Sequence, residues 1–61
     1  MTPAALTLWR THLGLSKRQL AEALGVHPVT ISKWEAGAQP IQHPTILSLA
    51  LETLERRTAP A

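Results

Sequence analysis

The sequence contains no cysteine, phenylalanine or tyrosine, and Trp9 and Trp34 are its only aromatic residues besides histidine. Without cysteine, neither a disulfide framework nor a thiolate metal site can stabilise the chain. Its 61 residues amount to one domain, near the lower limit of what folds unaided. An apolar core, extended where necessary by self-association, must therefore hold the fold together.

Long apolar runs and strong net charge are also missing. No stretch approaches the roughly 18 apolar residues of a membrane span, and the first residues do not form a charged-then-apolar signal segment. We therefore expect a soluble intracellular protein that is not associated with a membrane. Six Lys or Arg against four acidic residues give a net charge of +2, which permits an anionic partner without requiring one.

The sequence offers none of the arrangements typical of catalysis. It has no nucleophile–base combination, no paired carboxylates with a pocket and no phosphate-binding loop. His12, His27 and His43 are too scattered along the chain to suggest a metal site. We therefore expect no enzymatic activity, no metal, no cofactor and no small-molecule ligand.

Capping residues, prolines and glycines delimit four helical segments. Thr2-Pro3 is a typical helix start, Ser16 to Gln19 form a capping box, and glycines follow three of the segments. The expected helices are Pro3–Leu13, Lys17–Leu24, Pro28–Ala36 and Pro44 to about Arg57. The prediction is an all-α, compact bundle of four or five short helices over residues 1–57, with residues 58–61 as a disordered tail.

The second and third helices are separated by only three residues, 25–27. So tight a turn forces the two helices to cross steeply, as in a helix-turn-helix. Steep crossing requires a small residue at the closest approach, which Ala21 supplies, and a glycine at the corner, which Gly25 supplies. It also requires apolar side chains that point back from the second member, namely Val26, Ile31 and Trp34. Residues 17–36 are therefore predicted to form a helix-turn-helix.

At these residues the sequence resembles the Cro/phage-repressor-type, or XRE-like, helix-turn-helix family. The matching string is LGLSKRQLA at residues 13–21, Gly25-Val26, and TISKWEAG at residues 30–37. The resemblance covers roughly residues 4–57. It implies a lambda-repressor-like DNA-binding domain that places the helix starting at Pro28 in the major groove of double-stranded DNA. It further implies a sequence-specific transcriptional regulator, which we expect to be a repressor. Such a regulator would lie in the cytoplasm of a bacterium or a phage-infected cell, associated with the nucleoid.

The resemblance also implies roles for individual residues. The base-reading positions are Pro28, Val29, Ser32 and Lys33. The phosphate-contacting positions are Lys17, Arg18, His27, Thr30, Gln42 and His43. Lys33 is the best-equipped reader because its ammonium can donate to the O6 and N7 acceptors of guanine. Arg10 and Glu35 are placed together as a structural ion pair between the first and third helices.

Two residues depart from the family's pattern. His27 stands where relatives carry a serine, a threonine or a similar cap, and histidine is expected to be a poor cap. Pro28 has no N–H and reads little by hydrogen bonding, which indicates modest direct readout or help from DNA shape. His27 can equally be a phosphate contact or an exposed turn residue, whereas Trp9 and Trp34 are expected in the core.

The apolar residues of the fourth helix spread over about 200° at 100° per residue, wider than a small core requires. We therefore predict a homodimer built mainly on this helix, with Leu47, Leu51 and Leu54 at the interface. Leu8, on the outward side of the first helix, is a further spare apolar residue. Such a dimer would place two recognition helices roughly 34 Å apart, matching a palindromic operator.

A protein-interaction module, such as an antitoxin or an adaptor, is the alternative function for this fold. An acidic patch on the recognition face would favour it, whereas the face carries Lys33 with Lys17 nearby in the motif. Binding to DNA that weakens steeply with salt separates the two hypotheses.

Overall fold

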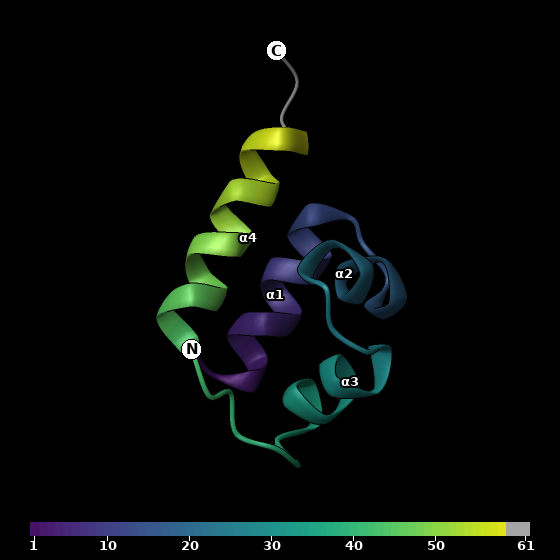
Figure 1. Ribbon diagram of the computed structural model, residues 1–61, viewed down its shortest axis with the longest axis vertical. Coiled ribbons are helices and arrows are strands. Elements are labelled where there is room, and N and C mark those ends of the chain that lie inside the picture. Colours follow the sequence, from purple (N-terminus) through teal and green to yellow (C-terminus); the bar gives the residue numbers. More distant parts are fainter. Residues whose placement is uncertain (59–61) are drawn as a thin grey trace.

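The computed structural model describes residues 1–58, which form four helices and no strand. The helices are α1 (Pro3–Leu13), α2 (Lys17–Leu24), α3 (Pro28–Ala36) and α4 (Pro44–Thr58) (Figure 1). The predicted all-α class is thereby confirmed. Of the predicted tail, Thr58 is the last residue of α4, and residues 59–61 lie outside the described residues. None of the helices within residues 1–58 has the length and apolarity of a membrane span.

At the starts of α1, α2 and α3, the preceding side chain accepts a hydrogen bond from a backbone N–H that the helix itself leaves free. Thr2 accepts a 3.1 Å hydrogen bond from the backbone N–H of Ala5. At α2, Ser16 Oγ accepts from the Gln19 N–H at 3.1 Å, and Gln19 Oε1 accepts from the Ser16 N–H at 2.9 Å. This reciprocal pair is a capping box, and it fixes where α2 begins.

The corner between α2 and α3 depends on the backbone conformation of Gly25. Its φ of 74° lies in the left-handed region, which a residue with a Cβ adopts only at a cost. This conformation lets the Val26 N–H donate to the Ala21 carbonyl at 3.0 Å, which closes the helix end. A Cβ added at Gly25 would meet no atom within 4 Å, so the turn requires the φ angle rather than empty space.

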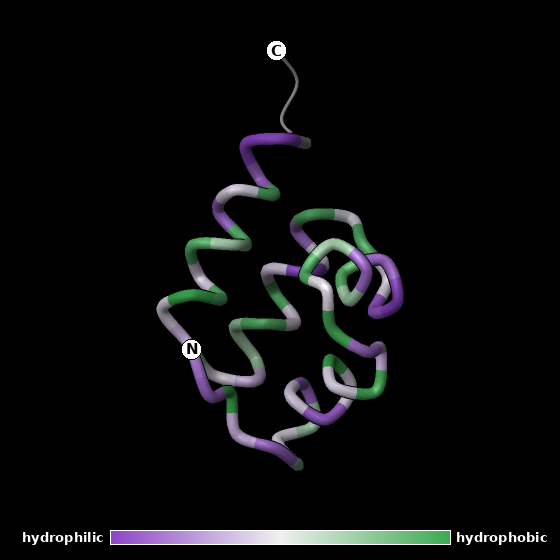
Figure 2. The backbone as a smooth tube through the Cα atoms, in the orientation of Figure 1, coloured by the Kyte–Doolittle hydropathy of each residue, from purple (hydrophilic) through white to green (hydrophobic). Residues whose placement is uncertain are grey.

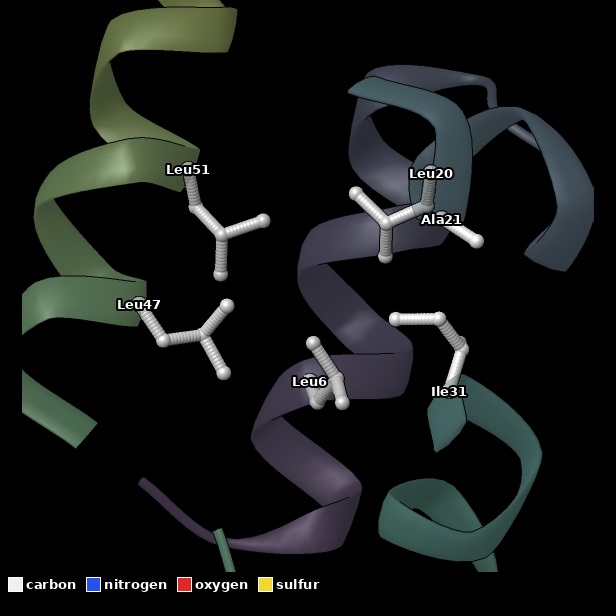
Figure 3. Close-up of a cluster of buried hydrophobic side chains, with 6 residues drawn as sticks. All are labelled: Leu6, Leu20, Ala21, Ile31, Leu47 and Leu51. Carbon is white, nitrogen blue, oxygen red and sulfur yellow. The ribbon is translucent and has the colours of Figure 1, made fainter. Parts of the chain in front are cut away.

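The core lies where α1 meets the other three helices. In Figure 1, α1 lies between α4 on one side and the α2–α3 pair on the other. Figure 3 shows the six buried hydrophobic side chains pointing toward one another: Leu6 of α1, Leu20 and Ala21 of α2, Ile31 of α3, and Leu47 and Leu51 of α4. Trp9 and Trp34 are half-buried and pack against this cluster. All four helices therefore share one core.

The structure corrects the side of α4 on which the dimer surface was predicted. Leu51 is fully buried and Leu47 is only 7% exposed, because this side of the helix faces Leu6 across the core. Leu54 is half-buried against the same cluster. The prediction that Leu47 and Leu51 face a partner is therefore wrong, because the monomer itself covers them. The exposed apolar side chains of α4 are instead Ile46, at 65%, and Leu49, at 58%.

Candidate nucleic-acid interface

The predicted reading residues lie on the side of α3 that faces away from the core. Val29 is 50% exposed, Lys33 is exposed, and Pro28 and Ser32 are half-buried. Val29 and Lys33 are four residues apart, so their side chains are neighbours on the helix surface. The buried Ile31 holds the opposite side of α3 in the core. This geometry leaves one apolar and one cationic side chain side by side and open to solvent.

The N-terminus of α2 is open to an anion. The capping box uses the N–H of Gln19, while the backbone N–H groups of Lys17 and Arg18 have no acceptor within residues 1–58. Free N–H groups and the positive end of the helix dipole favour a phosphate at such a position. The exposed side chain of Lys17 adds a full charge and forms no ion pair within the described chain.

Arg18 makes only a weak ion pair. Its Nε lies 3.6 Å from Glu22 Oε1, and the two side chains are 82% and 71% exposed. Solvent screens an exposed ion pair of this kind, so the pair contributes little to the stability of the fold. The guanidinium can therefore exchange its carboxylate partner for a phosphate at low cost.

The N-terminus of α3 is closed, unlike that of α2. His27 Nδ1 accepts a 3.1 Å hydrogen bond from the Val29 N–H, the Thr30 N–H donates to the His27 carbonyl at 2.9 Å, and Pro28 has no N–H. The first three residues of α3 therefore offer no free amide to a phosphate. Because Nδ1 accepts this bond, it carries no proton, and the neutral ring carries its proton on Nε2. The remaining donor of His27 is thus Nε2–H.

The expectation that His27 is a poor cap is wrong, for a geometric reason. Nδ1 is separated from Cα by the same number of bonds as Oδ1 of asparagine, a preferred cap. The ring can therefore reach the same backbone N–H as an asparagine side chain, as the bond to Val29 shows. Histidine is weakly represented among caps in general, and the sequence alone gave no reason to expect this one.

A buried carboxylate joins α3 to α1. Arg10 donates to Glu35 through Nε, at 2.8 Å, and through Nη2, at 3.1 Å, and Thr7 Oγ1 donates to Glu35 Oε1 at 3.0 Å. The side chains of Arg10 and Glu35 are 20% and 7% exposed. Arg10 Nη1 also donates to the Leu15 carbonyl at 3.1 Å, so one guanidinium joins α1, α3 and the turn before α2. The Thr7 contact was not predicted.

Two opposing effects act on the pKa of Glu35. Burial alone would raise it, but hydrogen bonds from Arg10 and Thr7 and the positive charges of Arg10 and Lys17 outweigh burial and lower the pKa. The hydrogen bond to Glu35 raises the pKa of Arg10 above its ordinary value, although burial opposes this. Both groups are therefore charged at neutral pH, and Arg10 stabilises the charged form of Glu35.

Gln42 and His43 are exposed in the loop before α4 and border an apolar groove of about 280 Å³. The other residues that line this groove are Leu24, Val26, Trp34, Gln39, Ile41, Ile46, Leu47 and Ala50. None of the four predicted base-reading residues of α3 lines it. The structure thus associates these two predicted phosphate contacts with the surface between α4 and the helix-turn-helix.

Comparison with known proteins gives one match. A family model described as helix-turn-helix matches residues 6–58, which include all of α2, α3 and α4. No curated protein and no solved structure matches the chain significantly.

Proposed function

Because the chain belongs to the Cro/phage-repressor-type, XRE-like family of helix-turn-helix DNA-binding regulators, we propose that it represses transcription as a homodimer on a palindromic operator. The observation that carries this proposal is the contrast between the two helix starts. The open end of α2, with Lys17, suits a phosphate. The N-terminal end of α3 is closed to a phosphate, and the exposed side of this helix presents Val29 in its first turn and Lys33 in its last turn to base edges.

We propose different roles for Lys17 and Lys33. Lys17 lies beside free amides, so it acts as a backbone grip that is indifferent to sequence. Lys33 lies on the outer side of α3 beside Val29, where an ammonium donates to guanine and an apolar side chain packs on a thymine methyl. Arg18, His27 Nε2–H and Thr30 add phosphate contacts around the turn, and Gln42 and His43 extend them along the loop before α4.

Binding to random duplex DNA at several salt concentrations tests whether Lys17 contacts a phosphate. Counterion release predicts an affinity that falls steeply with salt, and Lys17→Ala should reduce the slope of log K against log[salt] by about one. The matched control is Arg57→Ala, which removes one exposed charge from the last turn of α4 and should leave the slope nearly unchanged. Absence of binding even at low salt would favour the protein-interaction module, an antitoxin or adaptor, over a DNA-binding regulator.

Selection of preferred sites from a random DNA pool tests whether Lys33 contacts base edges. Lys33→Ala should relax the preference at one base-pair position, at a cost of about 1–3 kcal/mol on the preferred site. Lys17→Ala should instead weaken all sequences to a similar extent. Equal effects of the two substitutions on every sequence would contradict the division between a reading and a gripping residue.

We place the dimer surface on the exposed side of α4. Ile46 and Leu49 project from this helix, and Ile46 borders the groove that Trp34 and Ile41 also line. Figure 2 shows hydrophobic segments along most of α4, whereas its last turn is hydrophilic. A surface that holds both a ridge and a groove can be complementary to itself across a two-fold axis, as an isologous dimer requires. Pairing also compensates for the sparse readout of each copy.

The oligomeric state tests this surface. Light scattering coupled to gel filtration should give a dimer for the unaltered chain and a folded monomer for Ile46→Ser/Leu49→Ser. Leu8→Ser is the matched control, because Leu8 is 71% exposed on α1 and does not line the groove. A strict monomer at high concentration, both alone and with DNA, would exclude the dimer.

A further inference from the structure

Thr7 of α1 forms a hydrogen bond to Glu35 of α3 that the family resemblance did not assign. Its hydroxyl oxygen lies 3.0 Å from Glu35 Oε1 on α3 and 3.3 Å from the Pro3 carbonyl of its own helix. A hydroxyl has one proton and donates to one acceptor at a time. The carboxylate is both closer and charged, so the Thr7 hydroxyl donates its hydrogen bond to Glu35 rather than to the Pro3 carbonyl.

The position of this bond gives it a mechanical role. Arg10 grips the Glu35 carboxylate at both oxygens, but a guanidinium at the end of a long side chain can swing together with the group it holds. Thr7 is short and β-branched, so its hydroxyl has few available positions, all close to the backbone of α1. It lies one turn from Arg10 on the same helix. Together the two donors fix the carboxylate at two separate points of α1.

Glu35 transmits this constraint to the reading residues. It follows Ser32 by three positions and Lys33 by two on the same helix, and its side chain is only 7% exposed. A rotation of α3 about its axis would carry the carboxylate away from Thr7 and would turn Ser32 and Lys33 by the same angle. The hydroxyl bond therefore resists the movement that would misalign the reading side chains.

We propose that Thr7 is a positioning residue for DNA recognition, which sets through Glu35 the rotation of α3 and hence the direction of Ser32 and Lys33. This inference rests on the proposed DNA-binding function, since positioning has a use only if α3 reads bases. Thr7 is not among the residues proposed to contact DNA, and its hydroxyl donates to Glu35. Its removal should therefore lower sequence preference more than it lowers affinity for DNA in general.

The test compares Thr7→Val with Thr11→Val. Valine keeps the branched shape and removes the hydroxyl. Thr11 is the matched control because it is exposed on the same helix and its hydroxyl donates only to the Thr7 carbonyl, at 2.9 Å. Thr7→Ser, which restores the donor, serves as the rescue and also as the fallback if the valine variant folds poorly.

Two measurements on the free protein test the bond itself. In Thr7→Val, side-chain NMR should show a higher pKa for Glu35, and amide exchange should become faster in the C-terminal half of α3. Thr11→Val and Thr7→Ser should leave both quantities close to those of the unaltered chain. An unchanged Glu35 titration and unchanged exchange in Thr7→Val would overturn the proposal, whether or not the protein binds DNA.

A third measurement tests the consequence for recognition. The ratio of affinities for a selected site and for random duplex should fall about fivefold in Thr7→Val, a size typical of network substitutions that do not touch the ligand. The salt dependence of binding to random duplex should not change. An unchanged ratio beside a shifted Glu35 titration would overturn the positioning role. Failure of the unaltered chain to bind any DNA would overturn the proposed function, while the measurements on the free protein would still decide whether Thr7 holds α3.

Discussion

Replacing Arg10 by methionine should destabilise this domain strongly at neutral pH and much less in acid. The substitution removes two hydrogen bonds to Glu35 and one to the Leu15 carbonyl, and it leaves a carboxylate that is 7% exposed with Thr7 as its remaining hydrogen-bond donor. Breaking a buried pair from one side costs about 3–5 kcal/mol. A chain of 61 residues has a total stability of roughly 3–9 kcal/mol. Arg10→Met should therefore lose about a third or more of its stability at pH 7.

The dependence on pH identifies Glu35 as the cause. In the unaltered chain the folded pKa of Glu35 lies below its unfolded value of about 4.3, so the stability from this group is fully present above that pH and is lost as pH falls through the folded pKa. Without Arg10, burial is the largest remaining influence and should raise the folded pKa above the unfolded one. The variant should then gain stability as pH falls through that raised value.

Urea unfolding followed by circular dichroism at pH 7, 5.5 and 4 measures how the stability of each protein depends on pH. The difference in unfolding free energy between the two proteins should be largest at pH 7 and should narrow toward pH 4. The double variant Arg10→Met/Glu35→Leu is the control, because it removes both charges and should recover much of the loss at pH 7. A difference that stays constant from pH 7 to pH 4 would refute the argument that an unpaired Glu35 carboxylate causes the destabilisation.

Three further predictions concern the core, the cap and the corner. Leu51→Ala should cost about 2–5 kcal/mol in urea unfolding because Leu51 has no exposed surface; a loss below about 1 kcal/mol would contradict its place in the core. His27→Ala should cost about 1 kcal/mol in thermal unfolding through loss of the bond to the Val29 N–H, whereas His27→Asn should restore it; equal losses would show that the cap contributes nothing. Gly25→Ala should cost about 1–3 kcal/mol through strain at φ 74°, measured by urea unfolding, with no change in helix content.

The helix boundaries were predictable because the signals that set them are local. The capping box at Ser16 and Gln19, the prolines at positions 3, 28 and 44, and the glycine after each of the first three helices act within one turn of where they stand. The prediction for α4 ended one residue early, at Arg57 instead of Thr58, where the sequence has no glycine to mark the end. Each of these features needs only its neighbours along the chain.

The orientation of α4 was not predictable in the same way. Its periodicity indicated a broad apolar arc, but the consecutive residues Ile46 and Leu47, both within that arc, are 65% and 7% exposed. Which of them is buried depends on where α1 lies, a tertiary fact with no local signal. The Thr7 contact was missed for a similar reason. A single hydroxyl on a helix has no recognisable pattern, and its acceptor lies 28 residues away.

The placement of the proposed base-reading residues bears on how such a domain can change its target. Pro28, Val29, Ser32 and Lys33 all lie outside the buried cluster that holds the four helices together. Val29 and Lys33 are exposed, and substitutions at exposed positions usually change stability by no more than about 0.5 kcal/mol. A new operator preference can therefore arise by exchange of these side chains on an unchanged scaffold. The DNA preference can in this sense be changed with little effect on stability. This makes the domain a suitable starting point for selecting altered DNA specificities.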